Sequence, residues 1–196
     1  DRIRYTVVRD RSKAWELFRA GEIDYFPITL PEYWYQKSEM PPVFDGYVER
    51  YTWYNQFPRI PWSLYLNCAQ APLDDHDVRL GISHATNWQK VIDAIFRGDA
   101  SRLPGWTKGY GRFDNPEIMA RPFSVGKARE YFAKAGYVKE DENGILMKEN
   151  GERLEVALTF SNIPVRAKMM GILKEEALKA GLKFILDGLD HTVVYK

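Results

Sequence analysis

The sequence has few of the features that identify common classes of enzyme or membrane protein. It contains one cysteine, Cys68, so no disulfide can form within the chain, and we predict that Cys68 is buried and unreactive. No apolar run approaches the ~18 residues that a membrane-spanning helix needs. The nucleotide-binding patterns G-x-x-x-x-G-K-S/T and G-x-G-x-x-G do not occur, nor does the G-x-S-x-G pattern of serine hydrolases. The sequence therefore offers no motif for nucleotide binding or for hydrolysis by an activated serine.

Charge of one sign is not in excess, since 28 Lys and Arg residues face 27 Asp and Glu residues. The basic residues are dispersed, so nucleic acid is not an expected partner. The 3 histidines are too scattered for a spaced metal set, and we predict that His84 is structural. His76 could hold a metal with Asp74 and Asp77, but capping of a helix start accounts for all three more simply. We therefore predict no metal site, no cofactor and no catalytic residue.

Aromatic residues are the abundant component, at 14% of the chain with 6 Trp, 12 Tyr and 10 Phe. The hydrophobic content of 45% and the charged content of 28% are otherwise ordinary for a globular protein. Two explanations of the aromatic content stay open at this point. The rings could form a large core, or they could line a ligand cleft.

The most informative stretch begins at residues 64–66, whose apolar and aromatic side chains are typical of a half-buried strand. Asp74 and Asp75 then precede apolar residues at helical spacing, where carboxylates can accept hydrogen bonds from the first N–H groups of a helix. Asn87 has the same position before a second apolar-periodic segment, and Gly98 suits the left-handed residue that ends a helix. The stretch predicts a strand, a turn and two short helices.

The same stretch resembles the solute-binding proteins of peptide-type ABC importers, the dipeptide- and oligopeptide-binding family. Members usually show the pattern N-x-x-x-x-P-F-x-D-x-R-V-R-x-A-L-x-x-A-I-D-R. The positions that match it or fall in register with it are Asn67, Pro72, Asp74, Asp75, Val78, Arg79, Ala85 and Asn87. Asp77 stands where arginine is common, and Asn87 replaces the usual aspartate but keeps its capping chemistry. Gly81 stands where alanine is usual, and we expect it to cost its helix about 1 kcal/mol relative to alanine.

Three further blocks resemble the same family and follow in the family's order. Residues 14–25 have the form A-x-x-x-F-R-A-G-E-I-D-Y, close to the family's A-x-x-x-L-x-A-G-E-I-D segment. Residues 121–137 predict a helix capped by Ser124 and ended by Gly136, similar to the family's Y-P-Y-D-P-x-K-A-x-x-L-L-x-x-A-G-Y. A long helix, a glycine turn and a strand complete the series. The resemblance therefore extends over nearly the whole chain.

The remaining elements are predicted from periodicity, turn residues and caps. Predicted strands are 3–7, 23–26, 47–53, 154–160 and 183–189, and predicted helices are 14–20 with Ser12 as its cap, 31–36 and 164–180. Because a helix lies between the first two strands, we predict that they form a parallel pair. The Asn-Gly pairs at residues 143–144 and 150–151 predict hairpin turns.

The resemblance implies an α/β fold that is part of a two-lobe periplasmic-binding-protein type II fold, with mixed sheets flanked by helices. In this family the ligand binds between the lobes, which close by hinge motion. Residues 1–58 would be part of the first lobe and the crossover, and residues 59–196 most of the second lobe. The residues from 54 to 61, rich in proline and polar residues, would be the crossover itself; without the resemblance they could equally be an ordinary surface loop.

The resemblance also implies a function. The chain would belong to the substrate-binding component of an ABC transporter, which captures short peptides or peptide-like solutes in the periplasm and delivers them to a membrane permease. In relatives the ligand is usually a short peptide, and less often a nickel chelate, haem, a sugar or a peptide-like antibiotic. From the residues alone two alternatives stay open: a small α/β enzyme of unrecognised type, and an interaction module that uses exposed aromatic residues.

Four aromatic residues are the candidates for ligand contact. Tyr65 matches a position near the ligand in peptide-binding relatives. Trp62, Trp106 and Tyr110 are included because aromatic faces can stack on a ligand or contact it through apolar surface. Core packing is the alternative role for each of them singly.

The chain opens on charged residues and carries no secretory leader, so we expect it to be an internal piece of a longer exported protein. In peptide-binding relatives, an aspartate that holds the α-amino group of the ligand lies beyond a segment like residues 186–196. We therefore expect the 196-residue chain alone to bind peptides weakly or not at all.

Overall fold

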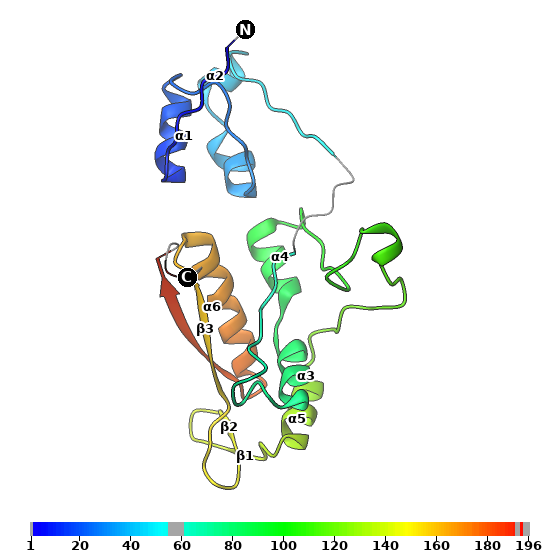
Figure 1. Cartoon of the computed structure of the whole chain (residues 1–196). Coiled ribbons are helices and arrows are strands. Elements are labelled where there is room, and N and C mark those ends of the chain that lie inside the picture. The colour runs from blue at the N-terminus through cyan, green and yellow to red at the C-terminus, as the bar shows by residue number, and fades with distance from the viewer. Residues whose placement is uncertain (1, 55–60, 191–192, 194–196) are drawn as a thin grey trace. The chain divides into compact units, whose positions relative to one another are not determined.

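The computed structural model describes residues 2–54, 61–190 and 193. Its internal contacts divide the chain into two compact units, which we call unit 1 (Asp1–Thr52) and unit 2 (Trp53–Lys196). Figure 1 labels the elements of both. Most of the predicted crossover lies outside the described residues, and the assignment of residues 1–58 and 59–196 to two lobes stays a prediction.

Unit 1 begins with the helix α1 (Arg11–Arg19). The Asp10 carboxylate accepts a hydrogen bond from the Lys13 N–H at 2.7 Å, so Asp10 caps this helix and the predicted cap Ser12 is wrong. Gly21 has a φ of +75° just beyond the helix end, a conformation that glycine adopts without steric cost. The helix therefore ends at the predicted place.

The core of unit 1 is largely aromatic. Trp15, Tyr33 and Met40 are buried, and the rings of Trp15 and Tyr33 meet edge to face with their centroids 5.3 Å apart. Tyr33 belongs to a π-helical turn, η1 (Tyr33–Lys37). The short helix α2 (Pro41–Phe44) follows it and packs against the core through Val43. Partly buried residues packed around it are Phe18, Phe26, Ile28, Leu30, Val43 and Val48. In this unit the aromatic residues are core residues, one of the two explanations that the sequence left open.

The strands predicted at 3–7, 23–26 and 47–53 are wrong, since residues 2–54 contain no strand. Ile3 and Val7, expected to face a core, are 80% and 90% exposed. A strand satisfies its backbone N–H and C=O groups only by pairing with a neighbour. Alternating side chains therefore do not make a strand where the described part of the chain supplies no partner.

Unit 2 contains a parallel pair of strands, β3 (Glu155–Ser161) and β4 (Lys183–Leu189). Their register places Glu155 opposite Lys183. The helix α6 (Pro164–Leu178) connects them, and Figure 1 shows it lying alongside both strands. β4 begins and ends at the predicted residues, because the period-2 alternation and the glycine turn before it both indicate a strand that starts there.

The core of unit 2 is mostly aliphatic and is shared by the helices and the two strands. Its larger buried members are Val78, Ile82, Val91, Phe132, Tyr137, Leu146, Leu154, Val156, Leu158, Met169, Met170, Leu173, Leu182 and Phe184. Alternate residues of β3 face this core, as the alternation in the sequence predicts: Val156 and Leu158 are buried in it, and Phe160 is partly buried against it.

Three further helices of unit 2 begin at the caps that the sequence predicts. They are α3 (His76–Ala85), α4 (Trp88–Phe96) and α5 (Val125–Lys134). The capping side chains of Asp75, Asn87 and Ser124 accept hydrogen bonds from the backbone N–H groups of Val78, Lys90 and Lys127. Each bond satisfies a helix N–H group that has no partner within its own helix.

Gly81 lies where α3 and α5 approach each other closely. A Cβ built on Gly81 would lie 2.2 Å from Cε1 of Phe132, whose side chain is fully buried. The Phe132 ring cannot yield cheaply because the core around it is packed. The expected cost of glycine relative to alanine is therefore outweighed in this fold, since alanine would overpack the contact.

The predicted hairpin is formed by β1 (Lys139–Glu140) and β2 (Leu146–Met147), which pair antiparallel. Gly144 in its turn has a φ of +78°, the conformation for which an Asn-Gly pair is suited. The hairpin lies near the start of β3, because Met147 bridges to Arg153. Figure 1 shows β1 and β2 at that end of the unit.

The segment before α3 differs from the prediction. Residues 64–66 have no strand partner among the described residues and are not a strand. Cys68, predicted to be buried, is exposed, with its Sγ 3.5 Å from the carbonyl oxygen of Leu66. The prediction was wrong because it relied on a strand that would have carried Cys68 into the core.

Candidate functional site

The four predicted ligand-contact residues come from two segments of unit 2. Trp62 and Tyr65 lie on the extended segment before α3, and Trp106 and Tyr110 lie on the long loop between α4 and α5. All four side chains are exposed to solvent. Burial in a core, the alternative that the sequence left open, is therefore not their role within the described residues.

The structure brings Tyr65 and Trp106 together, although they are far apart in the sequence. Their ring centroids are 5.6 Å apart, with the planes at 73°, which is the edge-to-face geometry that aromatic quadrupoles favour. Tyr65 is 76% exposed and Trp106 is 48% exposed, so each ring still presents area to solvent. The pair can offer an apolar, aromatic surface to a ligand.

Trp62 and Tyr110 are not part of that pair. The ring of Trp62 packs edge to face on Phe96 at the end of α4, with centroids 5.3 Å apart. Tyr110 lies in a turn of the loop, where its backbone N–H donates to the carbonyl of Thr107 at 3.0 Å. Among the described residues, no ring contact joins Tyr110 to the other three candidates. The four residues therefore do not form one cluster.

The loop that carries Trp106 and Tyr110 is fixed by a carboxylate. Asp114 accepts a hydrogen bond from the Gly109 N–H at 3.2 Å and an ion pair from Lys108 at 3.1 Å. The Gly109 bond, followed by the Lys108 bond, lowers the pKa of Asp114, so the carboxylate stays ionised at neutral pH. These contacts give the loop a defined turn next to the Tyr65–Trp106 pair.

Arg102 is a residue on the same loop that the sequence analysis missed. Its side chain is partly buried, and burial lowers the pKa of its guanidinium group, which nevertheless stays protonated. Within residues 2–54, 61–190 and 193, no carboxylate forms an ion pair with it. A partly desolvated cation four residues from Trp106 is suited to an anionic group. No pattern in the sequence marks Arg102 as a site residue, because a single arginine in a polar loop is ordinary.

Glu176 on α6 is the buried acid of unit 2, with only 2% of its side chain exposed. It accepts hydrogen bonds from Lys179 at 2.5 Å, Lys90 at 2.8 Å and Asn87 at 2.9 Å. Burial alone would raise the pKa of Glu176, but these three bonds together lower it to about 2. An acid held ionised in this way ties α4 to α6 and is not poised to donate a proton at neutral pH.

His84 is buried and has a structural environment, as predicted. Its Nδ1 lies 2.8 Å from the carbonyl oxygen of Pro122, and its ring stacks on that of Tyr131 with centroids 5.7 Å apart. In the part of the chain that the structure describes, no three or more His, Cys, Asp or Glu residues gather in a group that could hold a metal. None of the helices there combines the length and apolar character needed to cross a membrane.

Solved structures share this fold over part or nearly all of the chain. AppA of Bacillus subtilis, an oligopeptide-binding protein solved with a nonapeptide, has a TM-score of 0.71 at 18% identity, over 96% of this chain and 36% of its own. NikA of Brucella suis, solved with Fe(III)-EDTA, has a TM-score of 0.60 at 23% identity, over 66% and 26%. The oligopeptide-binding protein of Thermus thermophilus, solved with a pentapeptide, has a TM-score of 0.57 at 25% identity, over 63% and 21%.

Among curated proteins, the uncharacterized protein y4wM of Sinorhizobium fredii is 29% identical over 105 residues, which are 53% of this chain and 16% of that protein. The chain thus spans about a sixth of this relative, and between about a fifth and about a third of the three solved structures.

The structural likenesses confirm the predicted α/β fold class. A family model matches residues 1–196, and its description is "Bacterial extracellular solute-binding proteins, family 5 Middle". Because the match covers every residue, the resemblance inferred from four sequence blocks is confirmed. The chain belongs to the bacterial extracellular solute-binding proteins of family 5 and corresponds to their middle region.

Proposed function

We propose that this chain is part of the substrate-binding component of an ABC importer that captures short peptides or peptide-like solutes. The observation that carries the proposal is membership of family 5 over the full 196 residues. The fold of AppA, solved with a nonapeptide, supports a peptide as the ligand class. Binding, rather than catalysis, is the role proposed for the site.

Tyr65 and Trp106 would contact the ligand through their exposed ring faces, which suits the apolar side chains of a peptide. Arg102 on the same loop would attract a carboxylate, at the peptide C-terminus or on an acidic side chain. Trp62 and Tyr110 are kept as weaker candidates, because among the described residues neither ring contacts the Tyr65–Trp106 pair.

The proposed location is the periplasm, and the proposed partner is the membrane permease of the importer. The family description, which calls its members extracellular, supports a place outside the cytoplasm. Delivery to a permease follows from the importer role and needs no chemistry in the binding protein. No nucleic acid is proposed as a partner, because the net charge is only +1.

The test is a binding measurement on the full-length gene product. Pools of short peptides should raise its melting temperature without being hydrolysed, since a ligand at 100 times its Kd stabilises the folded state by about 2.7 kcal/mol. Isothermal calorimetry of a stabilising peptide should then give a Kd. Stabilisation by no pool, or turnover of a bound peptide, would overturn the proposal.

The contact residues are tested with matched variants on the same loop. Trp106→Ala should weaken the stabilising peptide by about tenfold, at the upper end of what an aromatic contact contributes. Phe113→Ala, which removes an exposed ring of the same loop, should leave the Kd unchanged. Arg102→Gln should weaken peptides with a free C-terminal carboxylate more than their amides, and Arg121→Gln is its control. If Trp106→Ala and Phe113→Ala changed the Kd equally, Trp106 would not belong to the proposed site. If Arg102→Gln and Arg121→Gln had equal effects, Arg102 would not belong to it.

A further inference from the structure

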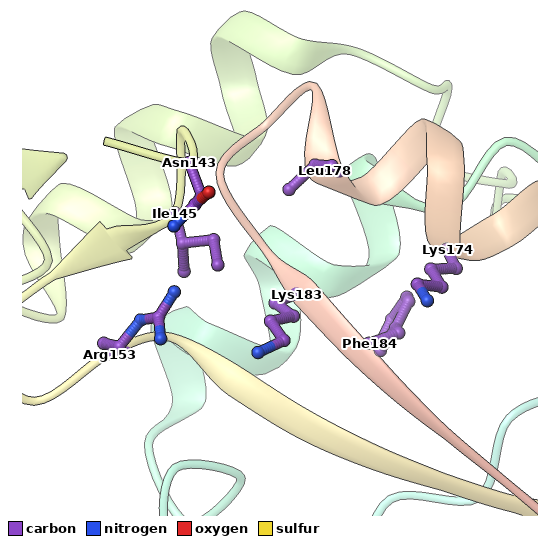
Figure 2. A pocket seen from close by; sticks show the side chains of 7 residues that line it. All are labelled: Asn143, Ile145, Arg153, Lys174, Leu178, Lys183 and Phe184. Atoms are coloured by element: carbon purple, nitrogen blue, oxygen red, sulfur yellow. The ribbon is translucent and has the colours of Figure 1, made fainter. Parts of the chain in front are cut away.

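Unit 2 contains a pocket that lies apart from the aromatic candidates. Its volume is about 390 Å³, within the range of small-molecule sites. Figure 2 shows that side chains from the β1–β2 turn, from the starts of β3 and β4, and from α6 converge on it. In parallel sheets, ligands usually bind beyond the carboxyl ends of the strands. This pocket lies at the amino ends, so its position is not the usual one.

The wall of the pocket has an apolar part and a cationic part. Ile145, Leu178 and Phe184 supply the apolar part, from the hairpin, α6 and β4 respectively. Arg153, Lys174 and Lys183 supply the cationic part, and no carboxylate of the described residues lines the pocket. Figure 2 shows the guanidinium group of Arg153 beside Ile145. A ligand here would meet apolar surface and positive charge together.

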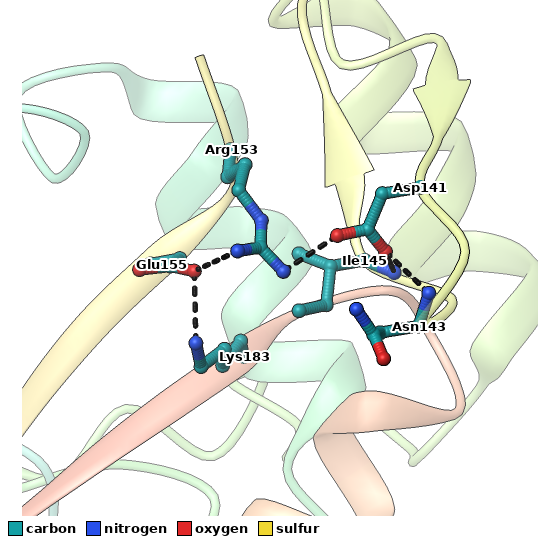
Figure 3. A network of polar contacts seen from close by, with 6 residues as sticks. All are labelled: Asp141, Asn143, Ile145, Arg153, Glu155 and Lys183. Carbon is teal, nitrogen blue, oxygen red and sulfur yellow. Dashed lines mark hydrogen bonds and ion pairs between the residues drawn. The ribbon is translucent and has the colours of Figure 1, made fainter. Parts of the chain in front are cut away.

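Two of the three cations are already neutralised from outside the pocket. Arg153 pairs with Asp141 at 2.5 Å and with Glu155 at 3.4 Å, and Lys183 pairs with Glu155 at 3.0 Å. Figure 3 shows this chain of contacts across the starts of the two strands. The carboxylates hold Arg153 and Lys183 in place, while each cation keeps further N–H donors for another acceptor.

The Asp141 carboxylate is itself fixed by the hairpin turn. It accepts hydrogen bonds from the backbone N–H groups of Ile145 at 2.8 Å and Asn143 at 2.9 Å. The Ile145 bond is the largest of the contacts that lower the pKa of Asp141, so the carboxylate stays ionised and keeps its hold on Arg153. The backbone of the turn therefore fixes Asp141, and Asp141 in turn fixes Arg153 in the wall of the pocket.

The third cation is not neutralised. In the described ranges 2–54, 61–190 and 193, Lys174 forms no ion pair with any carboxylate. Arg153 and Lys183 are balanced by Asp141 and Glu155, so the pocket and its immediate partners carry one positive charge in excess, that of Lys174.

We propose that this pocket is a second ligand site, which binds a small organic anion with one negative charge and an apolar body, such as an aromatic carboxylate. Lys174 supplies the unbalanced charge, Arg153 and Lys183 supply fixed donors, and the exposed side chain of Leu178 contacts the apolar body. The site uses none of the residues proposed for peptide capture, so it stands independently of that function.

The probe is 2-naphthoate, titrated into the full chain with its isoleucine methyl groups labelled for NMR. The Ile145 methyl resonance should move on titration, because this side chain lines the pocket. The neutral analogue 2-naphthalenemethanol should bind about tenfold more weakly, the size expected when a hydrogen bond to a charged group is lost. Equal affinity for the two probes, or no movement of Ile145 up to ~10 mM naphthoate, would overturn the proposal.

Matched variants on α6 test the role of charge. Lys174→Gln should weaken naphthoate by about tenfold and should not change the affinity of the neutral analogue. Lys168→Gln removes an exposed lysine of the same helix outside the pocket and should change neither. Leu178→Asn, at a partly exposed position, should weaken both probes. Equal naphthoate affinities of the two lysine variants would show that the pocket does not respond to the charge of Lys174, against the proposal.

Discussion

Two aromatic pairs, one in each unit, differ in their exposure to solvent. In unit 1, Trp15 and Tyr33 are buried and meet edge to face at 5.3 Å. In unit 2, Tyr65 and Trp106 meet in similar geometry at 5.6 Å but stay exposed, while aliphatic side chains dominate the core. The same residue types and the same contact therefore stabilise one region and form a surface in the other. Burial, and not ring contact, separates a structural pair from a candidate binding pair.

Removal of a buried ring should have the largest effect. Trp15→Ala should cost about 3–5 kcal/mol of unfolding free energy in unit 1, because it deletes the centre of a small core. Hydrogen exchange of the α1 amides measures this loss as lower protection. Tyr5→Ala, which removes an exposed side chain of the same unit, is the control and should change nothing. Similar losses in both variants would mean that Trp15 is not the centre of this core.

The second effect concerns the buried charge of unit 2. Because the pKa of Glu176 lies at about 2, below its ordinary value of 4.5, its ionised form contributes stability that is present above pH 4.5. That stability should be lost as the pH falls from 4.5 towards 2. Glu176→Gln should cost about 2 kcal/mol at neutral pH, as expected for lost hydrogen bonds to a charged group.

Urea denaturation at several pH values measures the contribution of Glu176. The variant should show a weaker pH dependence below pH 4.5 than the unmodified chain. Glu175→Gln, at the exposed neighbouring position, should keep the full dependence. If Glu176→Gln left the pH dependence of the unfolding free energy below pH 4.5 unchanged, the proposed role of Glu176 in the α4–α6 contact would be contradicted.

A smaller effect tests how tightly Phe132 is packed in the contact between α3 and α5. Gly81→Ala gains about 1 kcal/mol of helix propensity but overpacks against Phe132 at a cost of about 2 kcal/mol. The net result should be a loss of about 1 kcal/mol, seen as a lower denaturation midpoint. Gly171→Ala in α6 is the matched control, because a Cβ there meets nothing within 4 Å. Gly171→Ala should stabilise the chain. If Gly81→Ala also stabilised it, the close contact between Gly81 and Phe132 would be refuted.

The exposed pair should show the smallest effect on stability. Tyr65→Ala should change the free energy of unfolding by less than about 0.5 kcal/mol, as is usual for exposed positions. The full-length gene product with this substitution should nevertheless bind its peptide more weakly. A large loss of stability in the thermal melt would place Tyr65 among the structural residues and would end the contrast with Trp15.

The sequence predicted those features that depend on neighbouring residues. The caps Asp75, Asn87 and Ser124 were found because each needs only a local pattern. The strand 183–189 was found because its local alternation coincides with a partner, β3, that the fold supplies. The strands 3–7, 23–26 and 47–53 were wrong, because a strand depends on a partner that no local pattern supplies.

The candidate sites were less accessible to sequence reasoning. Tyr65 and Trp106 were each named, but nothing in the sequence indicated that they meet. Glu176 and Arg102 were missed because a single charged residue in a helix or a loop is common, and only burial distinguishes it. The pocket brings together Arg153, Lys174 and Lys183 because β3 and β4 pair in parallel and α6 connects them. The sequence alone does not indicate this arrangement.

The ion pair between Glu155 and Lys183 has a consequence for how the two parallel strands align. The two residues face each other on the first rung of the pair, at 3.0 Å. A slip by one position would place Glu155 opposite the buried Phe184 and would turn every following side chain of β4 to the wrong face. The pair of opposite charges on the first rung and the buried side chains that follow it therefore favour the same alignment of the two strands.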